Sequence, residues 1–484
     1  MLKALLLLPA CGALAIAALP LRRAAWMRAM ALLASGMTLA LALVVAYNFA
    51  PDRPGIQFAQ ATPWNPRLGT SFSLGIDGIS LPMVLLAALL GLVAVIASTR
   101  VRTNARLYYS LLLLLESALL GVFLARDWSL FYVFWELTLI PLFFLIDRLG
   151  GEQRHRAALN FFLYTLGGSV FMLVALLLLY DAAPGHSFDM ADIAAGAHGL
   201  PQGTQLLIFA GLLIGFGVKM PVFPLHGWLP LAHGEAPGPV SILLSGVLLK
   251  MGAYGLLRTA ETLPAALTAA QPLLAALAFA SLLYGSILAW RQTDLKTMIA
   301  YGSIAHMGVV LLGLATLNLA GLTGASLQML AHGLVAALLF LVVSALYERT
   351  HQRSLGSYRG LRQHSPRAAV LLALGFLAAV GLPGSAGFIA ELHILVGGFG
   401  RWQGTMLLFS TGVLISAAYA LRATGHLCFS PAAGTPPPAG DLNRTELLTA
   451  SVLTGCIVGI GIAPGPLLHI SAGALGALAR LFGG

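Results

Sequence analysis

Charged residues are scarce in this chain, and their scarcity excludes most soluble proteins. Only 9% of the 484 residues are charged, whereas 58% are hydrophobic and the mean hydropathy is +0.88. A soluble domain typically carries roughly a quarter charged residues. The three cysteines lie far apart and form no CxxC pair, which argues against an iron–sulfur cluster or a disulfide framework. No GxGxxG follows a strand pattern and no P-loop occurs, so we expect no nucleotide or other cofactor in this chain.

Long apolar runs are abundant instead, and they predict an all-α polytopic membrane protein. A helix needs about 20 residues to cross a bilayer core of about 30 Å. The first run resembles a signal peptide in length, but further runs follow it directly, so we expect it to be the first span. Fourteen runs are long enough, and they lie near 3–20, 27–49, 78–99, 106–125, 128–146, 158–180, 204–223, 238–258, 271–290, 297–316, 322–347, 367–397, 404–423 and 445–469.

The distribution of basic residues predicts the orientation of these spans. Of the 27 Lys and Arg residues, 18 fall in loops on one side of the predicted spans and 7 on the other. Basic loops remain in the cytoplasm, so we expect both termini on the outer side of a bacterial inner membrane. The net charge of +10 is therefore a topology signal, and it indicates no nucleic acid partner.

Lysine is used sparingly, and its positions are informative. The chain has four lysines, of which Lys219 and Lys250 lie inside apolar runs. Nearly all the basic residues in the loops, which set the orientation of the spans in the membrane, are arginines. Because a buried lysine can release its proton and an arginine cannot, Lys219 and Lys250 are candidates for proton transfer. Lys296 stands near Asp294 at a predicted helix start, and we expect these two residues to form a surface ion pair.

Two of the apolar runs are interrupted. Pro221 and Pro224 remove backbone donors, so the seventh helix must break near Lys219. Five spans later, residues 381–384 (Gly-Leu-Pro-Gly) interrupt the twelfth helix, and Glu391 follows. Broken backbone at membrane depth is tolerated where protein buries it or where it lines water. Interruptions at corresponding places in two halves are typical of inverted repeats with ion sites at the breaks.

Carboxylates and histidines also fall inside the runs. Glu116 and Glu136 lie about ten residues to either side of a short turn, which places both near the bilayer middle. We expect Glu136 to be the partner of Lys219, whereas Glu116 could be a neutral, hydrogen-bonded acid or a supporting group. His306 and His332 occupy the middle of consecutive spans. They could be packing residues or relay sites, since imidazole exchanges protons near neutral pH.

These groups suggest a lateral path for protons at mid-depth between two half-channels. His226 and His233 flank the proline-rich break without a cysteine or a paired carboxylate. They therefore favour hydrogen bonding at the break, or a water path, over a metal site. The predicted series is Glu136, Lys219, Lys250, His306, His332 and Glu391, with Glu116 in support.

Several long stretches resemble the antiporter-like subunits of respiratory complex I, most closely those of M type. The resemblance covers about residues 74–397. It implies about fourteen helices with two inverted five-helix repeats, in which helices 7 and 12 are broken. The implied divisions are 1–105, 106–258, 271–423 and 424–484. The stretches are WELTLIPLFFLIDRLGG, ALNFFLYTLGGSVFMLVALLLLY, residues 217–257 and DLKTMIAYGSIAHMG.

The resemblance also implies roles for single residues. Glu136 and Lys219 would be a coupled pair, and Lys250 would be the central lysine. His306 and His332 would link it to Glu391, the terminal site. An acid at this last position is typical of the M type, whereas the L and N types carry lysine there. The segment GFIAELHIL differs from the usual family sequence at residues 390, 392 and 393.

The implied function is proton translocation within an NADH:quinone oxidoreductase, driven by electron transfer in other subunits. Flavin and iron–sulfur clusters would belong to those partner subunits, and L and N type subunits would be neighbours in the bilayer. The nearest alternative is a subunit of a multisubunit cation/proton antiporter or a membrane-bound hydrogenase. Two further alternatives are a scaffold subunit with a vestigial channel and a small-solute symporter that acts alone.

Overall fold

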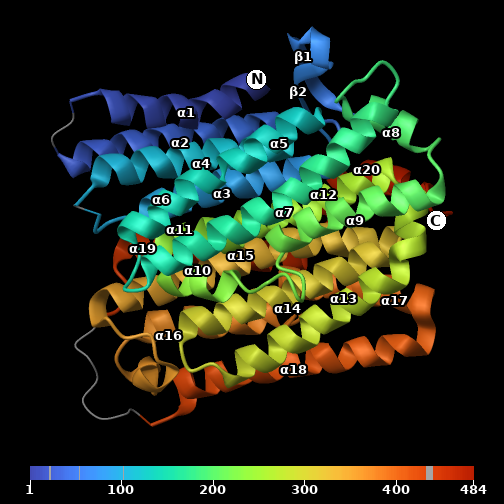
Figure 1. The fold of residues 1–484 in the computed structure, drawn as a ribbon. Coiled ribbons are helices and arrows are strands. Elements are labelled where there is room, and N and C mark those ends of the chain that lie inside the picture. Colours follow the sequence, from blue (N-terminus) through green and yellow to red (C-terminus); the bar gives the residue numbers. More distant parts are fainter. Residues whose placement is uncertain (21–22, 54, 102, 432–439, 484) are drawn as a thin grey trace.

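The chain folds into a bundle of long, nearly parallel helices (Figure 1). A computed structural model describes residues 1–484 except 21–22, 54, 102, 432–439 and 484. Twelve helices of this described part are long and apolar enough to cross a membrane, and α1 (Leu2–Ala18) and α16 (Pro366–Ala379) are shorter apolar helices. The predicted all-α membrane fold is confirmed. The count of fourteen spans, the two repeats and the domain boundaries stay predictions.

The N-terminal part contains a small β-hairpin that hydropathy did not predict. Strands β1 and β2 pair antiparallel, and Gln57 lies opposite Ile76. Both termini lie toward the end of the bundle that carries this hairpin (Figure 1). The elements of this part are α2 (Ala24–Tyr47), β1 (Gln57–Asn65), β2 (Thr70–Ile76), α3 (Ser80–Ala97) and α4 (Ala105–Leu124).

The next part of the chain contains the first interrupted helix. Helix α9 (Gln202–Lys219) ends at Lys219, just before Pro221 and Pro224, and the next helix begins at Leu229, so the predicted break is present. Asp127 caps α5 by accepting the backbone N–H groups of Ser129 and Leu130. The other helices here are α5 (Trp128–Leu137), α6 (Leu139–Leu149), α7 (Arg154–Ala182), α8 (Met190–Ala197), α10 (Leu229–Glu235), α11 (Gly238–Leu243) and α12 (Leu249–Thr262).

The second half of the chain also contains an interrupted helix. Helix α16 ends at Ala379 and α17 begins at Ala386, so the predicted interruption at residues 381–384 is also present. The C-terminal tail forms a further helix. The remaining helices are α13 (Pro264–Arg291), α14 (Leu295–Ala315), α15 (Leu319–Thr350), α17 (Ala386–Trp402), α18 (Met406–Thr424), α19 (Arg444–Ile462) and α20 (Gly465–Arg480).

Short turns of other helix types connect or distort these elements. Two are π-helical, at Leu244–Leu248 between α11 and α12 and at Gly425–Phe429 after α18. The 3₁₀ turns are Pro66–Leu68, Leu355–Tyr358, Leu361–Gln363 and Gln403–Thr405.

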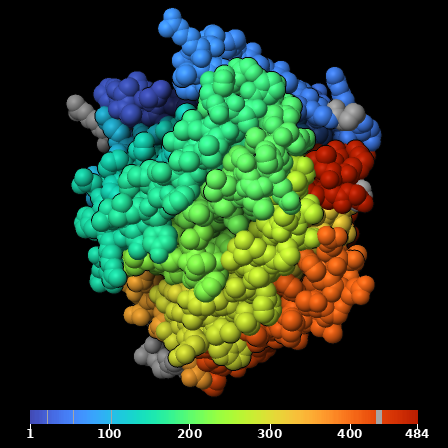
Figure 2. Space-filling view, turned by 45° about the vertical axis from the view of Figure 1, so that its right-hand side comes forward, coloured from blue at the N-terminus to red at the C-terminus, as the bar shows by residue number. Residues whose placement is uncertain are grey.

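The core of the protein is formed by the span that contains α12 together with α14 and α15. Nearly every residue of these three spans is buried, whereas most residues of α2, α7, α13 and α19 are partly buried or exposed. Figure 2 shows a face on which α7, α9, α13 and α18 cover the molecule from the N-terminal to the C-terminal side. The most buried helices are thus those that carry Lys250, His306 and His332.

Candidate functional site

The break after α9 places Lys219 beside α5 and α6. Its Nζ is buried, donates a hydrogen bond to Thr138 Oγ1 at 3.0 Å and lies 4.9 Å from the centre of the Trp135 ring. Glu136 is half-buried on the same segment and close enough to interact electrostatically with Lys219. The two residues are not in contact, since no ion pair within 4 Å joins them in the described structure. The structure therefore brings the predicted partners together with Thr138 as the residue that holds the amine.

Lys250 lies directly after a π-helical turn. Its Nζ donates to the Ser245 carbonyl oxygen at 2.5 Å and lies 2.7 Å from His332 Nδ1. The π turn at Leu244–Leu248 widens the helix just before this point. π-Helical turns are frequent at functional sites because they disturb the regular backbone hydrogen bonds. The distortion leaves a backbone carbonyl as a fixed acceptor for the buried amine.

A hydrogen-bonded series extends from Lys250 across α15 to α14. His332 Nε2 is 3.1 Å from Ser303 Oγ, which donates to the Ile299 carbonyl oxygen and lies 3.0 Å from Ser245 Oγ. These contacts are mutually consistent if Nδ1 of His332 accepts from Lys250 and Nε2 donates to Ser303. His332 is therefore oriented by hydrogen bonds on both ring nitrogens.

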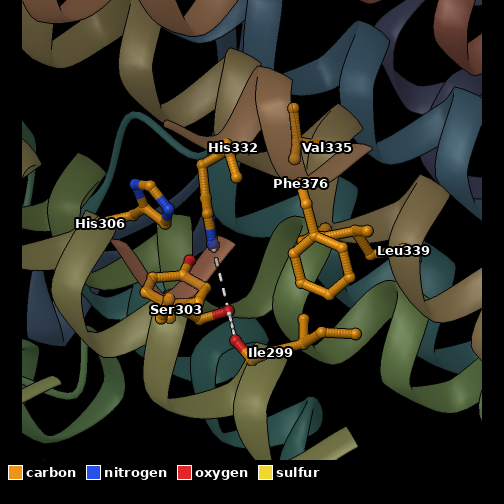
Figure 3. A pocket seen from close by; sticks show the side chains of 11 residues that line it. Ile299, Ser303, His306, His332, Val335, Leu339 and Phe376 are labelled. Atoms are coloured by element: carbon orange, nitrogen blue, oxygen red, sulfur yellow. Dashed lines mark hydrogen bonds between the residues drawn. The ribbon is translucent and has the colours of Figure 1, made fainter. Parts of the chain in front are cut away.

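His306 faces the same place from α14. The centres of the His306 and His332 rings are 5.3 Å apart. Figure 3 shows both rings on the wall of a small cavity, with Phe376 and Leu339 on the opposite side. The cavity has a volume of about 10 Å³, which is close to the space that one water molecule needs. Tyr419 of α18 also lines it. The two histidines thus share a site with room for about one water.

Glu391 lies against the second helix break. Gly381 has a φ of +70°, and a Cβ added there would come within 2.6 Å of Glu391 Oε2. The carboxyl group is buried and interacts electrostatically with Tyr419. Tyr419 is therefore positioned between the cavity of the two histidines and the terminal acid. The link from His306 and His332 to Glu391 stays a prediction.

Glu116 is separate from this series. Its Oε2 accepts a hydrogen bond from Ser35 of α2 at 2.5 Å, and its carboxyl group packs on Gly91 of α3. It is 1% exposed, and Oε1 has no hydrogen-bond partner in the described part of the chain. Its contacts fit the interpretation of a buried, hydrogen-bonded acid, and a supporting role stays a prediction.

Lys296 is not a surface residue, and the prediction of an ion pair with Asp294 is wrong. The side chain is 3% exposed, and its Nζ donates to the Ala236 carbonyl oxygen at 3.1 Å. Asp294 pairs instead with Arg353 at 3.3 Å. The cause is a contact between distant segments, in which the Leu295 N–H donates to the Arg353 carbonyl oxygen. This contact turns Asp294 toward the loop after α15 and leaves Lys296 facing inward.

Sequence reasoning missed the hydroxyl groups that hold the site together. These residues carry no strong hydropathy signal, because serine, threonine and tyrosine are common in apolar helices. Their spacing was a usable signal. Ser303 stands one turn before His306, and Thr138 two residues after Glu136. The missed residues are Thr138, Ser245, Ser303 and Tyr419.

The site contains proton-exchanging groups rather than metal ligands. Over the described ranges, no three His, Cys, Asp or Glu residues are placed to hold a metal ion. His233 stacks on Phe340 with ring centres 4.5 Å apart, and His226 stacks on Phe223 at 5.7 Å. A row of buried amines and imidazoles joined by hydroxyls can pass protons.

Comparisons with known proteins agree with this architecture. The family model described as "NADH:quinone oxidoreductase/Mrp antiporter, TM" matches residues 125–416. NAD(P)H-quinone oxidoreductase chain 4 1 of Synechococcus sp. (strain JA-3-3Ab) is 40% identical over 475 residues, which cover 96% of this chain and 90% of that relative.

Solved structures have the same fold. A chain in the structure of respiratory complex I from Thermus thermophilus with bound NADH is 34% identical, with a TM-score of 0.91 and 100% of both chains covered. A chain of the Mrp complex from Dietzia sp. DQ12-45-1b is 20% identical, with a TM-score of 0.88 and 99% of both chains covered, which shows the fold alone. This chain belongs to the NADH:quinone oxidoreductase/Mrp antiporter transmembrane family.

Proposed function

We propose that this chain is the M-type proton-translocating membrane subunit of an NADH:quinone oxidoreductase. The observation that carries the proposal is the buried hydrogen-bonded series of Lys250, His332 and Ser303. Lys219 lies at the end of α9, which packs on α12, and Glu391 lies on α17, which packs on α14. Ionisable side chains at membrane depth are costly and mark proton or ion pathways. The relatives named as chain 4 support the assignment to this subunit.

In the proposed mechanism, a proton held on Lys219 is stabilised by Glu136 and Thr138. Weakening the interaction with Glu136 would favour release of the proton toward Lys250. The Lys250 ammonium can pass a proton to His332 Nδ1, which lies 2.7 Å away. From the two histidines the proton continues to Glu391 and then outward. Electron transfer in partner subunits, which would hold the flavin and iron–sulfur clusters, supplies the energy.

The membrane arrangement follows from the same proposal. The chain would lie in the inner membrane of a bacterium, with both termini outside and antiporter-like subunits of L and N type as neighbours. Residues 106–258 and 271–423 would be the two inverted repeats. One interrupted helix in each, after Lys219 and after Ala379, supports that division.

The antiporter alternative has weaker support. The Mrp chain shares the fold at 20% identity, whereas the chain 4 relative reaches 40%. The acid at position 391 also fits the M type. A membrane-bound hydrogenase subunit would need the same proton-exchanging groups, and nothing in the site favours it.

The test is a pair of lysine substitutions in the assembled complex. Lys219→Ala should abolish proton pumping coupled to NADH oxidation in inverted membrane vesicles, because the first exchangeable amine is lost. Lys3→Ala is the matched control, since Lys3 lies near the N-terminus, where its amine contacts Thr62 and the Phe72 ring, away from the buried series. Full pumping by Lys219→Ala would refute the proposal and would favour a scaffold role for this subunit.

A further inference from the structure

A ring of polar contacts joins the ends of four helices in the second half of the chain, and the proposed mechanism does not use it. The ring connects α13 near its start, the end of α14, the start of α15 and the end of α17. In Figure 1 the turn after α17 lies at the end of the bundle where α8 and the C-terminus lie. The charge distribution predicts that this end faces outward. The side chains of the ring are those of Gln271, Thr316, Asn318 and Arg401.

Gln271 is the centre of the ring. Its side chain is 5% exposed, and its Oε1 accepts hydrogen bonds from Nε and Nη2 of Arg401 at 3.0 and 2.7 Å. Its Nε2 donates to the Ala315 carbonyl oxygen at 2.7 Å. The amide therefore ties the last turn of α17 to the last turn of α14, and each of its polar atoms has a partner.

Asn318 closes the ring on the side of α15. Its Nδ2 donates to the Gly397 carbonyl oxygen of α17 at 2.8 Å, and its Oδ1 caps α15 by accepting the Gly321 N–H. Thr316 Oγ1 lies 3.3 Å from the same oxygen. A Cβ added at Gly397 would come within 2.5 Å of the Gly321 nitrogen, so α15 and α17 touch through their backbones. The same end of α17 is thus held by α15 as well as by α13.

This ring lies between Glu391 and the end of the bundle. Glu391 and Arg401 are both on α17, and the rise of the helix between them is about 15 Å. Ile394 fills the space next to the acid and is 1% exposed. A Cβ added at Gly313 of α14 or at Gly324 of α15 would come within 3.0 or 2.6 Å of Ile394 Cγ1. Close apolar packing followed by a ring of hydrogen bonds therefore separates Glu391 from this end.

Arg401 brings a positive charge to the ring. Among the described residues no carboxylate lies within 4 Å of its guanidinium group, and its two printed hydrogen bonds go to a neutral amide. An arginine keeps its charge in a protein, so this cation is permanent. A fixed cation on a narrow path is an electrostatic barrier to protons and other cations, as in pores that exclude them. A subunit that pumps outward accumulates protons at the face where this barrier stands.

We propose that the ring of Gln271, Thr316, Asn318 and Arg401 is a gate that keeps expelled protons from returning to Glu391. The inference rests on the proposed function and on the predicted orientation. The structure has the gate closed, and opening it requires the Arg401 guanidinium group to leave Gln271 Oε1. Because Glu391 and Arg401 share α17, which begins at the second helix break, a shift of this helix moves the acid and the gate together.

The gate is tested by a leak measurement on the purified complex in liposomes. A pH gradient, acidic at the face that carries the ring, is imposed without NADH, and its decay is followed with a trapped pH-sensitive dye. We expect Arg401→Gln and Gln271→Leu to speed the decay roughly tenfold or more, the scale set by losing hydrogen bonds to a charged group. NADH oxidation should continue in both variants. The matched control is Arg67→Gln, an exposed arginine in the turn between β1 and β2, which should not leak.

A double variant distinguishes an open gate from a loosened bundle. A leak through the gate has to pass the terminal acid, so adding Glu391→Gln to Arg401→Gln should restore the slow decay of the wild type. A leak that persists in the double variant would overturn the inference, and so would wild-type decay in Arg401→Gln or in Gln271→Leu. The measurement uses no NADH, so it tests the gate separately from the proposed function, which full pumping by Lys219→Ala would refute.

Discussion

At the scale of single residues, small hydroxyl side chains hold the buried basic groups. Lys219 donates to Thr138, and His332 contacts Ser303. A hydroxyl is both donor and acceptor, so it can satisfy its neighbour before and after that neighbour exchanges a proton. A carboxylate in the same place would bind the protonated form far more strongly and would hinder release. The hydroxyls therefore suit sites that have to alternate between two protonation states.

Thr138 gives a prediction at this scale. Thr138→Val keeps the shape of the side chain but leaves the Lys219 amine without this acceptor, and loss of a hydrogen bond to a charged group costs about 1.5–3 kcal/mol. We expect pumping to fall roughly tenfold or more, measured as the proton uptake rate of inverted vesicles at equal complex content. Thr138→Ser should retain most activity. Equal defects in both variants would show that packing, rather than the hydroxyl, matters at this position.

The sequence predicted which residues take part in the site better than it predicted their contacts. Ionisable residues stand out in apolar runs because their burial is costly, so Lys219, Lys250 and Glu391 could be selected without a structure. Their hydrogen-bond partners depend on which helices pack together. The contact of Lys250 with His332 joins α12 to α15, and no local pattern encodes that pairing. The predicted ion pair between Lys296 and Asp294 was wrong for the same reason, because the position of Asp294 depends on a contact with a distant segment.

At the scale of elements, the second helix break positions the terminal acid. The backbone between α16 and α17 turns through Gly381 and Gly384, which both have positive φ values. Side chains other than glycine are strained in this region of φ. The two glycines differ in their surroundings, because Glu391 packs against Gly381 and nothing lies within 4 Å of a Cβ at Gly384. The break therefore turns the backbone and also provides the surface on which the Glu391 carboxyl group packs.

This difference gives a matched pair of variants. Gly381→Ala should displace the Glu391 carboxyl group and impair pumping, whereas Gly384→Ala adds a similar backbone strain of about 1 kcal/mol without touching Glu391. The measurement is the ratio of protons pumped per NADH oxidised. A lower ratio in Gly381→Ala alone is expected. Equal ratios in the two variants would mean that the position of Glu391 does not limit translocation.

Some elements could be predicted and others could not, for physical reasons. Prolines and glycines at Pro221, Pro224 and residues 381–384 act locally, so both breaks followed from the sequence. The π turn at Leu244–Leu248 contains no proline and no other local signal that predicts it. The β-hairpin depends on pairing between two polar segments, which hydropathy does not detect.

At the scale of the whole molecule, an ion cluster near the end of the bundle that carries the β-hairpin joins distant parts of the chain. Asp77 precedes α3 and contacts Arg258 of α12 at 2.7 Å, while Arg126 between α4 and α5 lies 3.5 Å from it. Burial alone would raise the pKa of Asp77, but Arg258 and Arg126 hold it well below its usual range. The cluster therefore anchors the helix of Lys250 to the N-terminal part of the protein.

The cluster predicts a pH-dependent effect on stability. Asp77→Asn leaves buried Arg258 with a weakened partner set and should destabilise the fold by about 3–5 kcal/mol at neutral pH. Because the folded pKa of Asp77 is depressed, its contribution is complete above an unfolded pKa of about 4, begins to decline below it, and is lost only as pH falls through the folded pKa. The gap in thermal unfolding temperature between wild type and variant should therefore be full at pH 7 and begin to narrow by pH 3.

A control for this prediction is available at the same end of the molecule. Asp52 pairs with His469 in an exposed position, so Asp52→Asn should leave the unfolding temperature nearly unchanged. An Asp77→Asn gap that is as large at pH 3 as at pH 7 would contradict the assignment of the charge to Asp77.

The π turn before Lys250 also limits how this chain can vary in length. A π turn accommodates one extra residue in a helix. A one-residue deletion within Leu244–Leu248 would restore regular backbone hydrogen bonds, so the Ser245 carbonyl oxygen would no longer be held as an acceptor for the Lys250 amine. The spacing between Ser245 and Lys250 therefore matters as much as the two side chains. We expect insertions and deletions there to abolish proton transfer through Lys250, and we expect conservative substitutions to be tolerated.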